Sequence, residues 1–263
     1  MNQVPQFSFT QTAPAWLLAG ILFVGLLLIY VVAHGFRRYH LTVKPDFAVA
    51  DLNTINGMLL GLLGLMLAFS FSMANERFNS RRGLVIEEAN DIGTVVLRLD
   101  VLPDSLRTVL RTSMKQYLEE RIAFYDARMD LNRAAAHYYR ADSISSSVWR
   151  AVVGHARKDN LSVIASEIIP ALNAMIDITT TRRAAGEATL PPTIIYFLFA
   201  LCLGSAFMLG YDHKGPVNWV VLICFATMLS ATVFTVIDLD RPRSGLINLD
   251  GPHQRMVDLR SLF

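Results

Sequence analysis

Three acidic side chains stand close together in the first half of the chain, namely Glu87, Glu88 and Asp91. Glu87 and Asp91 are four residues apart, so on a helix they share one face and could hold a cation or line an acidic constriction. The alternative is an ion-pair network with the neighbouring arginines, which are Arg81, Arg82 and Arg98. We favour the ion-pair network, and the sequence leaves the other interpretation open.

The chain carries none of the common patterns of a catalytic site. It has no glycine-rich phosphate loop with a lysine, and no HExxH, GxSxG or CxxC motif. Its six histidines never recur three or four residues apart, so no helical metal site is indicated. Cys202 and Cys224 lie in apolar runs and are predicted to be small core residues. We therefore predict a protein that is not an enzyme and needs no metal or cofactor.

The composition is typical of a membrane protein. Of the 263 residues, 53% are hydrophobic and 17% are charged, and the mean hydropathy is +0.38. A soluble domain usually has about a quarter of its residues charged. The formal net charge of +2 argues against nucleic acid as the main partner. The expected partner is the lipid bilayer.

Four apolar runs are long enough to span a bilayer, and they cover residues 16–33, 57–74, 192–211 and 217–237. We interpret the first as a retained helix, because no Lys or Arg precedes it and no convincing cleavage site follows it. None of the four runs contains a charged residue, so no proton relay or voltage sensor is indicated. An apolar span can still line a pore, because hydrophobic constrictions gate by dewetting.

The run of residues 57–74 is predicted to continue into a polar helix. At 1.5 Å per residue it would span about 27 Å, close to the thickness of the hydrocarbon core. No proline separates it from the charges that follow, so one helix should leave the membrane. Small residues that allow close helix packing share one face, at Gly57, Gly61, Gly64 and Ala68. Larger residues lie opposite, at Leu59, Leu62, Met66 and Met73, with Leu65 and Phe69 between the two faces.

The predicted fold is all-α. It consists of a first transmembrane helix pair (residues 1–74), a helical cytosolic domain (75–190), a second transmembrane pair (191–237) and a cytosolic tail (238–263). No alternating β pattern of useful length occurs.

The helices of residues 75–190 are predicted from proline, capping and periodicity signals. Pro103 followed by the acidic Asp104 marks a helix start. Asp142 and Ser143 are predicted to cap a third helix, and Pro170 should kink a fourth. Further breaks are expected at residues 140–147, at 159–160 and at Gly186.

Basic residues near the spans predict the orientation. One side of the membrane has four of them, at Arg37, Arg38, Lys44 and Lys214. The other side has eight, at Arg77, Arg81, Arg82, Arg182, Arg183, Arg241, Arg243 and Arg255. The positive-inside rule then places both termini and residues 75–190 in the cytoplasm.

Two motifs and the order of the parts resemble a known family. Residues 69–84, FSFSMANERFNSRRGL, and the later EEAN of residues 87–90 resemble the second transmembrane helix of bacterial bestrophins. Residues 238–245, DLDRPRSG, are similar to the acidic turn that follows the last span of that family. The chain as a whole resembles a group of bestrophin-like bacterial membrane proteins still more closely.

The resemblance implies a homo-oligomeric, pentameric ion channel of the bacterial inner membrane that conducts small inorganic ions. The second span of each copy would line the pore, and an apolar neck would narrow it at Phe69 and Leu65. The first neck position falls on Gly61, which has no side chain to constrict a pore. The calcium-binding acidic cluster of animal bestrophins has no match here, so no calcium dependence is predicted.

Further site residues are predicted under the channel hypothesis. The pore-helix neighbours of the neck are Leu62, Met66 and Met73. Candidates for a vestibule or for ion selectivity are Glu87, Glu88, Asp91, Arg77 and Arg81. The tail motif is represented by Asp238, Asp240 and Pro242. The alternative function is a non-conducting membrane scaffold or signalling protein that acts through its cytosolic helices.

Overall fold

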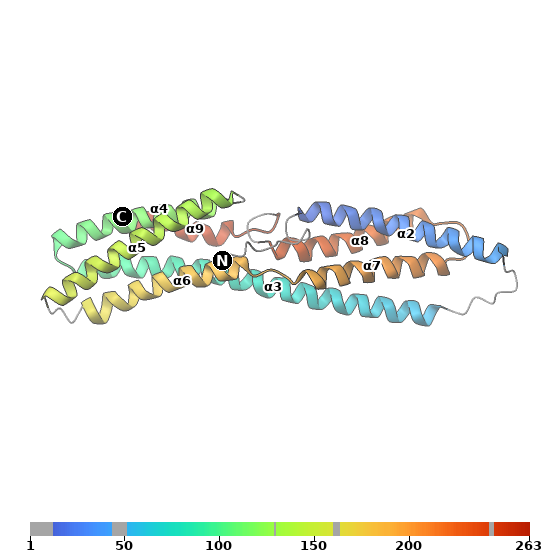
Figure 1. The fold of residues 1–263 in the computed structure, drawn as a ribbon, viewed down its shortest axis with the longest axis horizontal. Helices are drawn as coiled ribbons and strands as arrows, with labels where there is room; N and C mark the ends of the chain where they lie inside the picture. Colours follow the sequence, from blue (N-terminus) through green and yellow to red (C-terminus); the bar gives the residue numbers. More distant parts are fainter. Residues whose placement is uncertain (1–12, 44–51, 129, 160–163, 242–244) are drawn as a thin grey trace, which may run out of the picture. The chain divides into compact units, whose positions relative to one another are not determined.

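The structure is a computed structural model, and it describes residues 13–43, 52–128, 130–159, 164–241 and 245–263. The regular elements of these residues are all helices, which confirms the predicted all-α class (Figure 1). The chain forms two compact units. The membrane unit comprises residues 1–76 and 189–241, and the polar unit comprises residues 77–188 and 242–263.

Four helical segments of the described chain are long and apolar enough to cross a membrane, as predicted. The segments are Ala15–Val43, Asn53–Val101, Ser166–Asp212 and Trp219–Leu239. The corresponding helices are α2 (Ala15–Val43), α3 (Asn53–Arg98), α7 (Pro192–Asp212) and α8 (Trp219–Leu239). Charged residues do not end α2 or α3, because Lys, Arg and Glu are good helix formers once the chain has left an apolar run.

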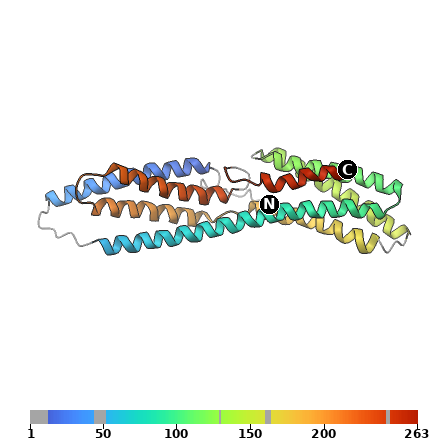
Figure 2. The same ribbon diagram turned by 180° about the vertical axis from the view of Figure 1, so that it is seen from behind.

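The core of the membrane unit lies where α2, α7 and α8 pack side by side (Figures 1 and 2). Leu22 and Leu26 of α2 are buried there with Cys202 of α7 and Val233 of α8. Cys202 is thus a small core residue, as predicted, whereas Cys224 is exposed on α8 and its predicted core position is wrong.

Helices α2 and α7 approach each other closely at Gly210. A Cβ atom built on Gly210 would lie 2.4 Å from the carbonyl oxygen of Tyr30, which is far inside van der Waals contact. Glycine at this position lets two helix backbones come together, as membrane helices often do.

α3 is one continuous helix of 46 residues, as predicted. At 1.5 Å per residue it is about 69 Å long, more than twice the thickness of a bilayer's hydrocarbon core. Part of α3 must therefore lie outside the membrane if its apolar part spans it.

The polar unit contains the second half of α3 and the remaining helices. They are η1 (Leu99–Val101), α4 (Asp104–Asp126), α5 (Leu131–Asp159), the π-helical η2 (Ile164–Ile168), α6 (Ile169–Glu187), α9 (Asp250–Asp258) and η3 (Leu259–Leu262). Pro103 is the N-cap residue of α4, which confirms the predicted start. The core is built from apolar stripes on α3, α4, α5 and α6, with Met256 of α9 fully buried among them.

The predicted break near residues 140–147 is wrong, because α5 runs through it. Asp130 provides the cap instead of Asp142, since its Oδ1 accepts a hydrogen bond from the backbone N–H of Arg133 at 3.0 Å. Ser145 donates its hydroxyl to the carbonyl of Asp142 at 2.9 Å and so stays inside the helix.

Pro170 lies in the first turn of α6, immediately after the π-helical turn η2. Proline has no N–H to donate, so it interrupts the backbone ladder at this point. The structure therefore places the predicted distortion at a junction between two helix types and not in the middle of one helix.

Candidate functional site

α3 meets the rest of the membrane unit along one narrow side. Its buried residues there are Asn56, Leu63 and Ser70, which recur every seven positions, and Ala74, which lies one turn after Ser70. Seven residues are close to two helical turns, so these side chains form one line along the helix. In the most apolar 18-residue window of α3, 17% of the residues are buried, against 28%, 33% and 39% in the other candidate spans. The described part of the chain thus leaves most of the circumference of the apolar half of α3 uncovered.

The predicted neck residues lie on this uncovered side. Phe69 is 55% exposed and Leu65 is 50% exposed. At 100° per residue, Leu65 and Phe69 are turned by about 200° and 240° from Leu63, so they face away from the buried line. Among their predicted neighbours, Leu62 and Met73 are exposed and Met66 is partly buried against the membrane-unit core.

The glycines of α3 are open as well. A Cβ atom built on Gly57, Gly61 or Gly64 meets nothing within 4 Å in the described chain. The close helix approach predicted for this face is therefore not made within one copy. At Gly61 the predicted neck has no side chain to continue the row that Leu65 and Phe69 form.

Polar contacts hold the start of α3 and the end of α2 to the end of α7. The Asn56 side chain donates from Nδ2 to Asp212 Oδ2 at 3.1 Å, and Arg37 donates from Nη1 to the Tyr211 carbonyl at 2.8 Å. The rings of His34 and His213 lie 5.7 Å apart between centroids. His213 is thus partly packed against α2.

In the polar unit, Glu88 is fully buried between two arginines. Its Oε1 accepts from Arg121 Nε at 2.5 Å, and its Oε2 accepts from Arg182 Nη1 at 2.5 Å. Burial alone would raise the pKa of Glu88, but the charges and hydrogen bonds of the two arginines outweigh it and lower this pKa to about 2. Glu88 is ionised at every physiological pH and holds α3 to α4 and α6.

Arg121 is the least expected member of this cluster, because its side chain is almost completely buried. Its guanidinium lies 4.9 Å from the ring centroid of Phe124, within the range of a cation–π contact. The Glu88 carboxylate raises the pKa of Arg121 against the opposing effect of burial. The burial of Arg121 could be inferred from the sequence, because Arg121 lies in the apolar stripe of α4, one turn from both Tyr117 and Tyr125.

The three residues of the predicted acidic group, Glu87, Glu88 and Asp91, lie on different sides of α3 and differ in burial. Glu87 is exposed, Asp91 is half-buried and Glu88 points into the core. Burial, followed by the charges of Glu87 and Glu88, raises the pKa of Asp91. An ion-pair network exists, as favoured, but its arginines are different ones from those predicted.

The three arginines predicted to pair with the acidic group do not bind Glu88. Arg81 is buried and donates to the carbonyls of Ala185 and Ala188 at 3.0 and 2.5 Å, so it satisfies the C-terminal carbonyls of α6. Arg98 pairs with Glu167 at 3.6 Å, and Arg82 is exposed. Arg77, the remaining vestibule candidate, has a buried Nη1 atom with no hydrogen-bond partner among the described residues.

The described acids of the tail motif are buried at the end of α8. Asp240 Oδ2 accepts a hydrogen bond at 2.7 Å from the backbone N–H of Leu190, which is itself buried just before α7. Asp238 is also buried. Pro242 lies outside the described residues. Asp238 and Asp240 are thus buried where the end of α8 packs against the residues just before α7.

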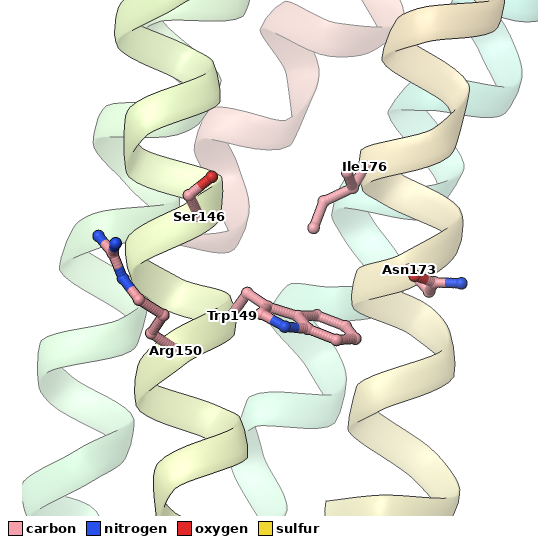
Figure 3. Close-up of a pocket in the computed structure, with 5 residues that line it drawn as sticks. All are labelled: Ser146, Trp149, Arg150, Asn173 and Ile176. Carbon is pink, nitrogen blue, oxygen red and sulfur yellow. The ribbon is translucent and has the colours of Figure 1, made fainter.

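A groove of about 400 Å³ lies between α5 and α6 (Figure 3). Figure 3 shows the indole of Trp149 extending from α5 toward α6, whereas the side chains of Arg150 and Asn173 extend away from the groove. The polar groups that line it do not converge on a common point. The uncovered face of α3 is the stronger candidate for a functional surface.

A family model for the bestrophin-like domain matches residues 20–250. The chain belongs to the bestrophin-like family. The match runs from the first apolar helix to the start of α9 and so includes α3, Glu88 and the tail motif. No curated protein matches this bestrophin-like chain in sequence.

Solved structures of a bacterial bestrophin homologue from Klebsiella pneumoniae have the same fold. A tryptophan-to-alanine variant is 12% identical, with a TM-score of 0.69 over 95% of this chain and 99% of the other. An isoleucine-to-threonine variant is 12% identical, with a TM-score of 0.67 over 92% and 99%. The form solved by zinc phasing is 13% identical, with a TM-score of 0.65 over 90% and 98%. The bestrophin fold is therefore retained over nearly the whole chain at low sequence identity.

Proposed function

We propose that this bestrophin-like protein is a homopentameric ion channel in which α3 of each copy lines a central pore. The observation that carries the proposal is the position of Leu65 and Phe69. Both are large, apolar and exposed, and both face away from the line of residues that holds α3 to its own chain. A ring of copies would turn this free side of α3 toward a shared axis.

The neck of the proposed pore has two apolar rings. Leu65 and Phe69 are four residues apart, about one helical turn, so five copies would form two rings about 6 Å apart along the axis. Such rings close a narrow pore by excluding water. Gly61 has no side chain to form a third ring, so the pore widens there.

Glu87 is the leading candidate for the wall beyond the neck. A regular α-helix repeats its orientation after 18 residues, or five turns, and Glu87 follows Phe69 by this interval. Asp91 follows one turn later. Glu88 is assigned to the structural ion-pair cluster because its carboxylate is buried against Arg121 and Arg182.

The proposed setting is the bacterial inner membrane, with both termini and the polar unit in the cytoplasm. The asymmetry of basic residues supports this orientation. Transport of small inorganic ions, and not catalysis, is the proposed activity.

A non-conducting membrane scaffold is the second candidate, and the open glycines of α3 favour it. Gly57, Gly61 and Gly64 would let the α3 helices of neighbouring copies approach so closely that no hole remains between them. The polar unit would then act by binding another protein.

Ion flux from vesicles containing the purified protein tests the proposal. Phe69→Ala removes the larger ring of the neck and should raise the flux several-fold above that of the wild type. Phe71→Ala is the matched control: Phe71 is also exposed, but it is turned by about 80° from Leu63 and lies on another side of α3.

The two candidate functions give different results. Equal flux from Phe69→Ala and Phe71→Ala would contradict the neck assignment. Particles of the purified protein without five-fold symmetry would contradict the pentamer. Particles in which the α3 helices leave no central hole, together with silent vesicles for all three proteins, would favour the scaffold.

A further inference from the structure

Within the polar unit, a small number of identified contacts hold the last described residues of the chain against α4. Helix α9 packs against α4 (Figure 1). Met256 of α9 is fully buried. Tyr125 donates its hydroxyl to Asp250 Oδ1 at 2.9 Å. Further along, Arg260 binds both carboxylate oxygens of Glu119 at 2.8 and 2.6 Å. Residues 249–263, here called the C-terminal segment, thus cover one face of α4.

His253 lies at the centre of this contact, with its ring buried. It is 6% exposed, and its ring stacks on Tyr125 with 4.0 Å between centroids and 25° between planes. Neither ring nitrogen has a hydrogen-bond partner among the described residues. The nearest carboxylate oxygen, Asp126 Oδ1, is 3.6 Å from Nε2, beyond hydrogen-bond range.

The charged groups around His253 would do little to stabilise a protonated, positively charged ring. Asp126 of α4 is mostly exposed, so solvent screens it. Glu88 of α3 is already bound by two arginines, and Asp250 of α9 by Tyr125 and Arg128. Arg182 of α6 adds a positive charge on the same side. Burial is the largest effect on the pKa of His253 and lowers it, and the positive charge of Arg182 lowers it further. Asp126 and the other two carboxylates raise this pKa by less, so it stays below its ordinary value.

We propose that His253 is a proton-sensitive latch: the neutral ring holds the C-terminal segment against α4, and protonation of the ring releases it. The basis is geometric, because the ring is buried at the centre of the contact, stacks on Tyr125 and makes no hydrogen bond to a described residue. The latch is independent of whether the protein conducts ions, since its readout is the docking of one segment on one helix.

The direction of the pH effect follows from linkage. A histidine whose pKa is lower when docked than when released favours docking fully above its ordinary value of about 6.5. As the pH falls below that value, the released form takes up the proton first and docking weakens. One linked proton changes the ratio of docked to released segment by at most about tenfold for each pH unit.

Hydrogen exchange of the full-length protein in lipid nanodiscs measures this ratio. Amide protection of residues 250–258 should fall several-fold between pH 7.5 and pH 5.5, after correction for the intrinsic exchange rate at each pH. Residues 144–152, in the middle of α5, are the internal reference and should keep their protection.

Three variants separate the latch from other effects of acid. His253→Phe keeps the stacking on Tyr125 but cannot be protonated, so the pH effect should vanish. His155→Phe changes an exposed histidine of the same unit and should leave the effect unchanged. Asp126→Asn removes a carboxylate that favours the charged ring and leaves the buried ring itself unchanged. The fall in protection of residues 250–258 between pH 7.5 and pH 5.5 should therefore be at least as large as in the wild type.

The proposal is overturned if wild-type protection of residues 250–258 is the same at both pH values. It is equally overturned if His253→Phe loses protection as the wild type does, or if Asp126→Asn abolishes the effect. Should His253→Phe fail to fold, the wild-type and Asp126→Asn measurements still decide the matter.

Discussion

Replacing Glu88 with glutamine removes one negative charge from a buried site that holds two arginines. The shape of the side chain is nearly unchanged, so the variant tests the charge and not the packing. Arg121 and Arg182 would then face a neutral amide, and among the described residues no other carboxylate lies within ion-pair distance of either guanidinium. Removing one partner from a buried ion pair usually costs about 3–5 kcal/mol, because the remaining charge stays desolvated.

The pKa of Glu88 gives an independent magnitude. Its lowering from 4.5 to about 2 corresponds to about 3 kcal/mol of stabilisation of the folded polar unit. A loss of this size lowers the melting temperature of a unit of this length by roughly 10 °C. Thermal unfolding in detergent, followed by circular dichroism, measures the change.

Glu87→Gln is the matched control, because it makes the same substitution at the neighbouring exposed position. It should alter stability by no more than about 0.5 kcal/mol. The double variant Glu88→Gln with Arg121→Met removes one of the stranded positive charges and should recover part of the loss. Equal melting temperatures for Glu87→Gln and Glu88→Gln would refute the assignment of Glu88 to the buried cluster.

The same cluster predicts a pH dependence with a definite sign. A carboxyl group whose pKa is lowered by folding contributes its full stabilisation above its ordinary pKa of 4.5. That contribution is lost as the pH falls from 4.5 toward 2, because the unfolded chain takes up the proton first. The difference in melting temperature between the wild type and Glu88→Gln should therefore narrow over this range.

The apolar spans and the continuous α3 could be predicted from sequence because both depend on local properties. A span is set by the length of an uncharged run, and α3 continues because no proline or glycine pair stops it. The predicted break near residues 140–147 is wrong because it also relied on local residue types. Asp and Ser favour helix caps, but within a long amphipathic helix their side chains can bond to the helix backbone instead, as Ser145 does.

The partners of Glu88 could not be predicted from neighbouring residues. Arg121 is 33 positions away and Arg182 is 94 positions away, so helix periodicity around Glu88 contains no information about them. The arginines close in sequence point elsewhere, as Arg81 does toward the end of α6. A charged residue inside an apolar stripe, such as Arg121, is the one sequence feature that indicates a buried partner of opposite charge.

Two further substitutions test the packing of the membrane unit, and thermal unfolding in detergent measures both. Gly210→Ala places a Cβ 2.4 Å from the Tyr30 carbonyl oxygen and should destabilise by about 1–3 kcal/mol, whereas Gly204→Ala on the same helix meets nothing within 4 Å and should be neutral or stabilising. Equal effects at the two glycines would contradict the close approach of α2 and α7. Asp240→Ala leaves the buried N–H of Leu190 without its acceptor and should cost about 1–3 kcal/mol, while Asp240→Asn keeps an acceptor oxygen and should cost less. If the alanine and asparagine variants are equally destabilised, the charge of Asp240 matters more than its hydrogen bond, and the contact with Leu190 is not what holds the end of α8 to the start of α7.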